Sequence, residues 1–110
     1  MVSGKQARMV LVTCGTMAEA RRIARAMVEA RLAACVNIVG APVESIYRWK
    51  GKVEKAREVL LAMKTTAARL AALEREVKRL HSYDVPEFIA LGVAAGSRGY
   101  LAWLIASVKA

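Results

Sequence analysis

The chain has 110 residues, of which 56% are apolar, and a formal net charge of +9. This length predicts a single domain over residues 1–110, with a core that folds without disulfides or a structural metal. No apolar run approaches the ~20 residues of a membrane-spanning helix, and the N-terminal run is too short for a secretory signal. We therefore expect no membrane insertion and a cytoplasmic protein whose two cysteines are free thiols.

The positive charge raises the question of a nucleic-acid partner. The basic residues are spread along the chain, however, and in "EARRIAR" and "EREVKR" they stand beside glutamates, as on solvated helix faces. The strands also lack the aromatic RNP1 pattern of an RNA-binding sheet. Nucleic-acid binding is therefore the weaker interpretation of the charge.

The first elements in chain order are a strand and a helix. The branched run at residues 9–13 is typical of a central strand. Thr16 and Glu19 form a capping-box pattern that begins a helix, which we expect to end near Leu32. The apolar face of this helix consists of Ala20, Ile23, Ala24, Met27 and Val28. Its exposed face consists of Glu19, Arg22, Arg25 and Glu29.

Residues 33–64 predict a long hairpin. Its first strand covers residues 33–49, with a break or bulge at residues 40–42, and its return strand covers residues 52–64. Lys50-Gly51 is typical of a two-residue hairpin loop, in which glycine supplies a positive φ.

The hairpin loop sets a register that places Trp49 opposite Lys52 and Glu44 opposite Arg57. The arm is longer than the helix beside it, so its end should project beyond the domain. Unpaired edges and exposed apolar side chains on such an arm predict pairing with another copy of the chain. The alternative is a frayed, solvated hairpin.

The remaining elements are a helix, a strand and a terminal helix. Thr65 and Thr66 can cap the first of these helices. Its apolar stripe consists of Leu70, Leu73, Val77 and Leu80. A strand should begin at Pro86, and Ser97 can cap the last helix. The inward side chains of that helix are Leu101, Leu104 and Ile105.

The order β-α-β-β-α-β predicts an α+β, ferredoxin-like fold with strand order 4-1-3-2 and the main helices on one face of an antiparallel sheet. In this topology Cys14 lies at one end of the sheet, and Cys35 and Lys64 lie at the other. The two cysteines are then too far apart for a disulfide within one subunit. The segment 81–87 and the hairpin tip lie at the Cys14 end.

The segment "RLHSYDVPEF" contains three candidate metal ligands, His81, Asp84 and Glu87. Histidine, carboxylate and thiolate suit copper or zinc. Their spacing matches no established metal signature, and the alternative is a polar turn in which His81 contacts the last carbonyls of the preceding helix. Cys35 is either a further ligand or a small buried side chain. Within this topology, Cys35 could join such a site only from another subunit.

Other side chains admit two interpretations each. Lys64 either contacts an anion or is the charged end of a strand. The large aromatic side chains are more typical of packing or subunit contacts than of stacking platforms. They are Trp49, Tyr83, Tyr100 and Trp103. The chain has no P-loop, G-x-S-x-G, zinc-protease or dinucleotide motif, so we predict no catalytic residues and no enzyme activity.

Five segments stand at defined spacings along the chain. They are "EARLAACVNIV" (29–39), "SIYRWKGKV" (45–53), "MKTT" (63–66), "LHSYDVPEFIAL" (80–91) and "YLAWL" (100–104). In this order they resemble the CutA family, the divalent-cation-tolerance proteins. The resemblance implies a ferredoxin-like homotrimer joined through edge strands, with binding of copper or another divalent cation and without enzyme activity.

Matched to the motifs of that family, Cys35, His81 and Glu87 are the leading metal ligands, and Asp84 is an accessory acid. Ser82 replaces a proline that the family usually carries beside the histidine. The family also shares its trimeric plan with PII-type signalling proteins, which bind ligands between subunits.

This trimeric plan, shared by the two families, implies an alternative function. In a PII-like regulatory module, Lys64, Tyr83 and Trp49 would line a cleft for a small anionic ligand or a partner peptide, together with Glu87.

Overall fold

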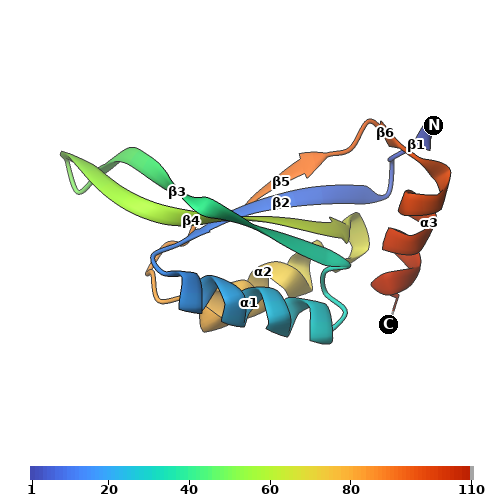
Figure 1. Cartoon of the computed structure of the whole chain (residues 1–110), viewed down its shortest axis with the longest axis horizontal. Coiled ribbons are helices and arrows are strands. Elements are labelled where there is room, and N and C mark those ends of the chain that lie inside the picture. The colour runs from blue at the N-terminus through green and yellow to red at the C-terminus, as the bar shows by residue number, and fades with distance from the viewer. Residues whose placement is uncertain (110) are drawn as a thin grey trace.

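The main sheet of the protein has four antiparallel strands in the order β3-β4-β2-β5. The structure is a computed structural model that describes residues 1–109. The strands are β2 (Ala7–Cys14), β3 (Cys35–Trp49), β4 (Lys52–Thr66) and β5 (Ile89–Gly92). The helices α1 (Met17–Glu29) and α2 (Leu70–Leu80) cover one face of this sheet (Figure 1). The predicted ferredoxin-like α+β fold and its strand order are confirmed.

A second, two-stranded sheet pairs β1 (Val2–Ser3) with β6 (Ala95–Gly96) beside α3 (Arg98–Ser107). The predicted strand from Pro86 is therefore wrong in extent, because β5 begins only at Ile89 and a break after Gly92 separates it from β6. Strands of two residues are too short to produce a periodic pattern in the sequence. The chain approaches itself closely here, since a Cβ built on Gly4 would lie 2.4 Å from the Val93 carbonyl oxygen.

The ends of α1 are set by hydrogen bonds. The predicted cap is confirmed, because the Glu19 N–H donates to Thr16 Oγ1 at 3.1 Å. The predicted end near Leu32 is wrong. The helix ends at Glu29 because Arg31 adopts a φ of 58°, and the Leu32 N–H then turns back to the Met27 carbonyl.

The apolar face of α1 is narrower than predicted. Ile23 and Met27 are fully buried against the sheet, but Val28 is 41% exposed. Val28 follows Met27 by one residue, or about 100° around the helix, and so lies at the edge of the apolar stripe. Glu19, which was predicted to be exposed, is buried because the segment after α2 covers it and the Ser82 N–H donates to its carboxylate.

The hairpin has the predicted register. Trp49 pairs with Lys52, Glu44 pairs with Arg57, and the irregularity falls between Val39 and Val43. Lys50 and Gly51 both have positive φ, 50° and 80°, as a type I′ loop requires. The tip projects well beyond α1 and α2 in Figure 1.

The predicted caps of α2 are wrong. A 3-10 turn, Ala67–Arg69, precedes the helix, and Thr66 makes no side-chain cap bond. The Thr65 hydroxyl instead donates to the Leu32 carbonyl at 2.7 Å and ties β4 to the turn that follows α1. By contrast, Ser97 caps α3 as predicted, by accepting a hydrogen bond from the Tyr100 N–H.

The core lies between the main sheet and α1 and α2. Its largest fully buried side chains are Val10, Val12, Ile23, Met27, Leu61, Met63, Leu73 and Val77. A smaller cluster lies under α3 and consists of Ala7, Ala34, Leu101, Leu104 and Val108. Ile105 is only partly buried. Within residues 1–109, none of the helices has the length and apolarity to cross a membrane.

Candidate functional site

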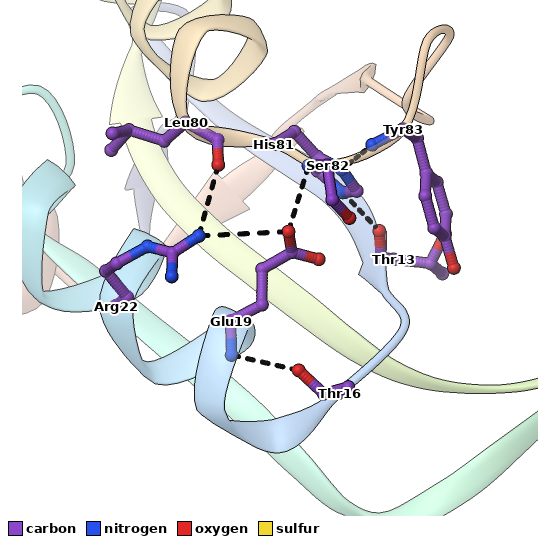
Figure 2. Close-up of polar contacts among 8 residues, drawn as sticks. All are labelled: Thr13, Thr16, Glu19, Arg22, Leu80, His81, Ser82 and Tyr83. Atoms are coloured by element: carbon purple, nitrogen blue, oxygen red, sulfur yellow. Dashed lines mark hydrogen bonds and ion pairs between the residues drawn. The ribbon is translucent and has the colours of Figure 1, made fainter.

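The segment 81–87, termed the joint below, connects α2 to β5 around the end of β2. His81 ends α2, and its backbone N–H donates to the Val77 carbonyl. Its ring is buried against β2, with Nε2 2.7 Å from the Thr13 carbonyl oxygen, and Nδ1 accepts the Tyr83 N–H at 3.1 Å (Figure 2). Because Nδ1 accepts and a carbonyl can only accept, Nε2 carries the proton. The ring therefore contacts β2 rather than the last carbonyls of α2.

Glu19 connects α1 to the joint. Only 7% of this residue is exposed, and its carboxylate accepts the Ser82 N–H at 2.9 Å. Arg22 lies 3.9 Å from the same carboxylate and donates to the Leu80 carbonyl at 3.3 Å (Figure 2). Burial opposes ionisation of Glu19, but hydrogen bonding from Ser82 outweighs it and holds the pKa below its ordinary value. The joint folds over the first turn of α1, which is why Glu19 is not exposed.

Cys14, Glu19 and His81 form a buried cluster, termed the buried triad below. One possible ligand atom from each residue lies within 4.8 Å of the other two. Burial, and then the charges of Glu19 and Glu58, raise the pKa of the Cys14 thiol to about 12, so the thiol is protonated at neutral pH. The expected proximity of Cys14 and His81 is confirmed. Sequence reasoning missed Glu19 as a member, because its place in a capping box accounted for it fully.

A groove of about 580 Å³ lies between the hairpin arm and the joint. Four of the residues predicted as site residues line this groove: Trp49, Tyr83, Asp84 and Glu87. The other lining residues are Thr13, Ser45, Ile46, Tyr47, Glu58 and Val85. His81, the first residue of the joint, does not line the groove, since its ring is buried against β2.

Glu58 is the groove residue that sequence reasoning missed. Only 7% of it is exposed, and its carboxylate accepts a 2.8 Å hydrogen bond from the Tyr83 hydroxyl. Burial, with this hydrogen bond, raises the pKa of Tyr83 above its ordinary value. Burial and the nearby Glu58 charge also raise the pKa of Glu87. No signal in "EKAREV" distinguishes Glu58 from an ordinary surface glutamate of a strand.

Cys35 and Lys64 lie at the opposite end of the sheet. They pair directly across β3 and β4, whereas Cys14 pairs with Val59. Val59 and Lys64 stand five residues apart on one strand, roughly 17 Å. Both cysteines are free. Within one chain, Cys35 and Lys64 therefore belong to neither the buried triad nor the groove.

Comparison with known proteins identifies the family. A family model described as "CutA1 divalent ion tolerance protein" matches residues 8–107. The chain belongs to this family. Within it, the chain is 53% identical over 95 residues to the divalent-cation tolerance protein CutA of Thermus thermophilus, a match that covers 86% of this chain and 91% of that protein.

Other CutA relatives differ in length and location. The chain is 48% identical over 93 residues to human protein CutA, of which it spans about half, 51%. The Arabidopsis thaliana relative is named as chloroplastic, and the solved protein from Archaeoglobus fulgidus is titled as periplasmic. A cytoplasmic location for this chain therefore stays a prediction.

Solved CutA structures have the same fold as this chain. The Thermus thermophilus protein superposes with a TM-score of 0.91 at 48% identity, covering 94% of this chain and 99% of that one. CutA from Synechococcus elongatus also gives 0.91, at 38% identity, covering 98% and 95%. The resemblance inferred from the five sequence segments is thereby confirmed.

Proposed function

We propose that this chain is a non-enzymatic homotrimer that binds copper or another divalent cation, with His81 among the ligands. The family description and the names of its relatives support the link to divalent cations. The observation that carries the ligand assignment is the buried triad, whose thiol, carboxylate and imidazole lie within 4.8 Å of one another. This donor set suits copper and zinc.

The triad has to change its hydrogen bonds and protonation to hold a cation. The Cys14 thiol must lose its proton, which the positive charge of a nearby metal favours. Both ring nitrogens of His81 are engaged, one with the Thr13 carbonyl and one with the Tyr83 N–H, so one of these contacts must open. The cluster thus has the right donors but is not already arranged around a metal.

The ligand set expected from the sequence places the cation between subunits instead. Asp84 and Glu87 line the groove, but the ring of His81 is buried against β2, and Cys35 lies at the far end of the sheet. A neighbouring subunit would have to supply Cys35. The two ligand sets share His81, so variants of the two cysteines distinguish them.

The test is chelator competition for copper and zinc with reduced protein. We expect one site per subunit, weakened at least about tenfold by Cys14→Ser and by His81→Ala but unchanged by Cys35→Ser. Weakening by Cys35→Ser and His81→Ala, with no change in Cys14→Ser, would instead support the site between subunits. Unchanged affinity in both His81→Ala and Cys14→Ser would overturn the assignment. Because His81 is buried, thermal melts check that each variant folds.

A second candidate function has its own supporting observation. The groove lined by Trp49, Tyr83 and Glu87 has the size of a small-molecule site and suits a PII-like regulatory trimer. Lys64 could contribute to it only from another subunit. Stabilisation by metabolites without any response to metals, in a thermal-shift panel, would favour this candidate over cation binding.

A further inference from the structure

The groove combines aromatic faces with carboxylates. Tyr47, Trp49 and Tyr83 supply the aromatic rings, and Glu58, Asp84 and Glu87 supply the acids. Lysine and arginine are absent from the ten residues that line it. The chain as a whole carries 18 lysines and arginines against nine acids, so an acidic groove is opposite in charge to the chain as a whole. Such a groove repels the small anion that a PII-like site would be expected to take.

Glu58 is the most buried acid of the groove. It stands in the β4 half of the arm, opposite Val43 and on the same side of the strands as Ser45 and Tyr47. Leu61 and Met63, which pack under the helices, have the opposite parity on β4, so Glu58 faces away from α1 and α2. The groove therefore opens on the face of the arm that the helices leave uncovered.

The charge of Glu58 is not compensated within the chain. Its single side-chain hydrogen bond comes from the neutral Tyr83 hydroxyl, and it forms no ion pair in the described part of the chain. A buried carboxylate without a cationic partner is costly. Glu87 lines the same groove as Glu58, and its pKa is raised by burial and then by the Glu58 charge.

We propose that the groove binds a small organic cation, a primary ammonium or guanidinium group on an apolar body. Its positive end lies between Glu58 and Glu87, and its body lies against Tyr47, Trp49 and Tyr83. Carboxylates and aromatic faces both attract such a group, and the aromatic faces distinguish it from a hydrated inorganic cation. This inference rests on the second candidate function, a ligand-binding groove, and is independent of metal binding at the buried triad.

The experiment uses three probes with similar bodies and different charges: phenethylammonium, 2-phenylethanol and 3-phenylpropionate. Calorimetry measures their binding to the full chain in chelator-treated buffer at physiological salt. We expect phenethylammonium to bind, the alcohol to bind at least about tenfold more weakly, and the carboxylate not to bind. Equal affinities for all three would overturn the proposal, because the site would then be merely apolar.

Matched variants locate the site. Glu58→Gln retains an acceptor for the Tyr83 hydroxyl and should weaken phenethylammonium binding about tenfold. Glu87→Gln tests the other carboxylate of the pair, which is less buried than Glu58, and should also weaken phenethylammonium binding. Glu44→Gln is the control, since it removes an equal charge from an exposed position on the opposite face of the arm. Equal weakening by Glu44→Gln would show a general charge effect and contradict the proposal.

The outcome for the groove can be distinguished from the outcome for metal binding at the buried triad. Loss of metal binding in Cys14→Ser with phenethylammonium binding intact would leave the groove proposal standing. Absence of phenethylammonium binding at about 1 mM would overturn the groove proposal without affecting the triad.

Discussion

His81 and Glu19 show how single polar residues hold the joint in place. His81 ties the joint to β2 through the Thr13 carbonyl, and Glu19 ties it to α1 through the Ser82 N–H. In the described chain, buried side-chain nitrogen and oxygen atoms all have hydrogen-bond partners, so these contacts are complete. The joint therefore has a structural role, whether or not a metal also binds there.

Replacing Glu19 by glutamine should change both the stability and its pH dependence. Its pKa is lowered in the folded chain, so its ionisation stabilises the fold above its ordinary pKa, and this stabilisation is lost as the pH falls through the folded value. At pH 7, Glu19→Gln should lower the free energy of unfolding by about 1 kcal/mol, because a charged acceptor becomes neutral. Urea denaturation of metal-free protein at fixed concentration measures this difference.

The effect of Glu19→Gln on stability should depend on pH. Between about pH 5 and pH 3, the wild-type chain should lose more stability than Glu19→Gln, and the two should converge. Glu29→Gln is the control on the same helix, since its side chain is exposed. Parallel pH curves for wild type and Glu19→Gln would contradict the prediction.

The hairpin arm shows how a short turn sets an entire element. Lys50 and Gly51 both adopt positive φ, and the register that this loop sets holds through seven pairs, from Trp49–Lys52 to Val43–Glu58, before the irregularity between Val39 and Val43 shifts it. The strands of the arm also carry Tyr47, Trp49 and Glu58 to their positions in the groove, whereas Tyr83, Asp84 and Glu87 come from the joint. Slippage by one residue would turn Tyr47 and Glu58 to the other face.

Gly51→Ala should destabilise the chain by about 1 kcal/mol. The cost arises from the left-handed backbone at φ 80°, since an added Cβ would meet no atom within 4 Å. Gly40→Ala is a matched control, because its added Cβ also meets nothing and its φ is not in that region. Thermal or urea unfolding compares the two variants, and an equal loss in both would refute a conformational cause.

The whole molecule is elongated and has open sheet edges. It measures 44 × 25 × 24 Å, and its long dimension reflects the projecting arm (Figure 1). β3 and β5 stand at the two edges of the main sheet. Exposed apolar side chains occur along these edges and the arm, among them Ile46, Val53, Ile89 and Leu91. Open edges with apolar side chains support the proposed homotrimer.

Val53→Asp should weaken self-association. Val53 is 65% exposed on the arm and outside the groove, so a charge there should interfere with packing between copies more than with the fold. Sedimentation velocity over a concentration series should show a trimer for the wild type and dissociation at concentrations at least about tenfold higher for the variant. Val28→Asp is the control, because Val28 is exposed on α1. A monomeric wild type, or identical behaviour of both variants, would contradict the homotrimer or its contact through the arm.

The sequence by itself determined the features that depend on neighbouring residues. The period of two in the strands, the apolar stripes of the helices, and the Lys50-Gly51 loop predicted the element order, the register and the strand order, all of which are confirmed. The topology also placed His81 with Cys14 and separated both from Cys35. Trp49, Tyr83, Asp84 and Glu87 were expected at that same end, and they line one groove.

The tertiary structure alone decided the features that depend on residues far apart in the chain. Glu19 is buried because Ser82 folds over it, and Glu58 is buried under Tyr83. Whether a glutamate is solvated or buried depends on which segment of the chain covers it. The local pattern of apolar and polar residues around the glutamate does not identify that segment. For the same reason the acidic character of the groove, and with it the sign of the ligand we propose, became visible only after the arm and the joint were brought together.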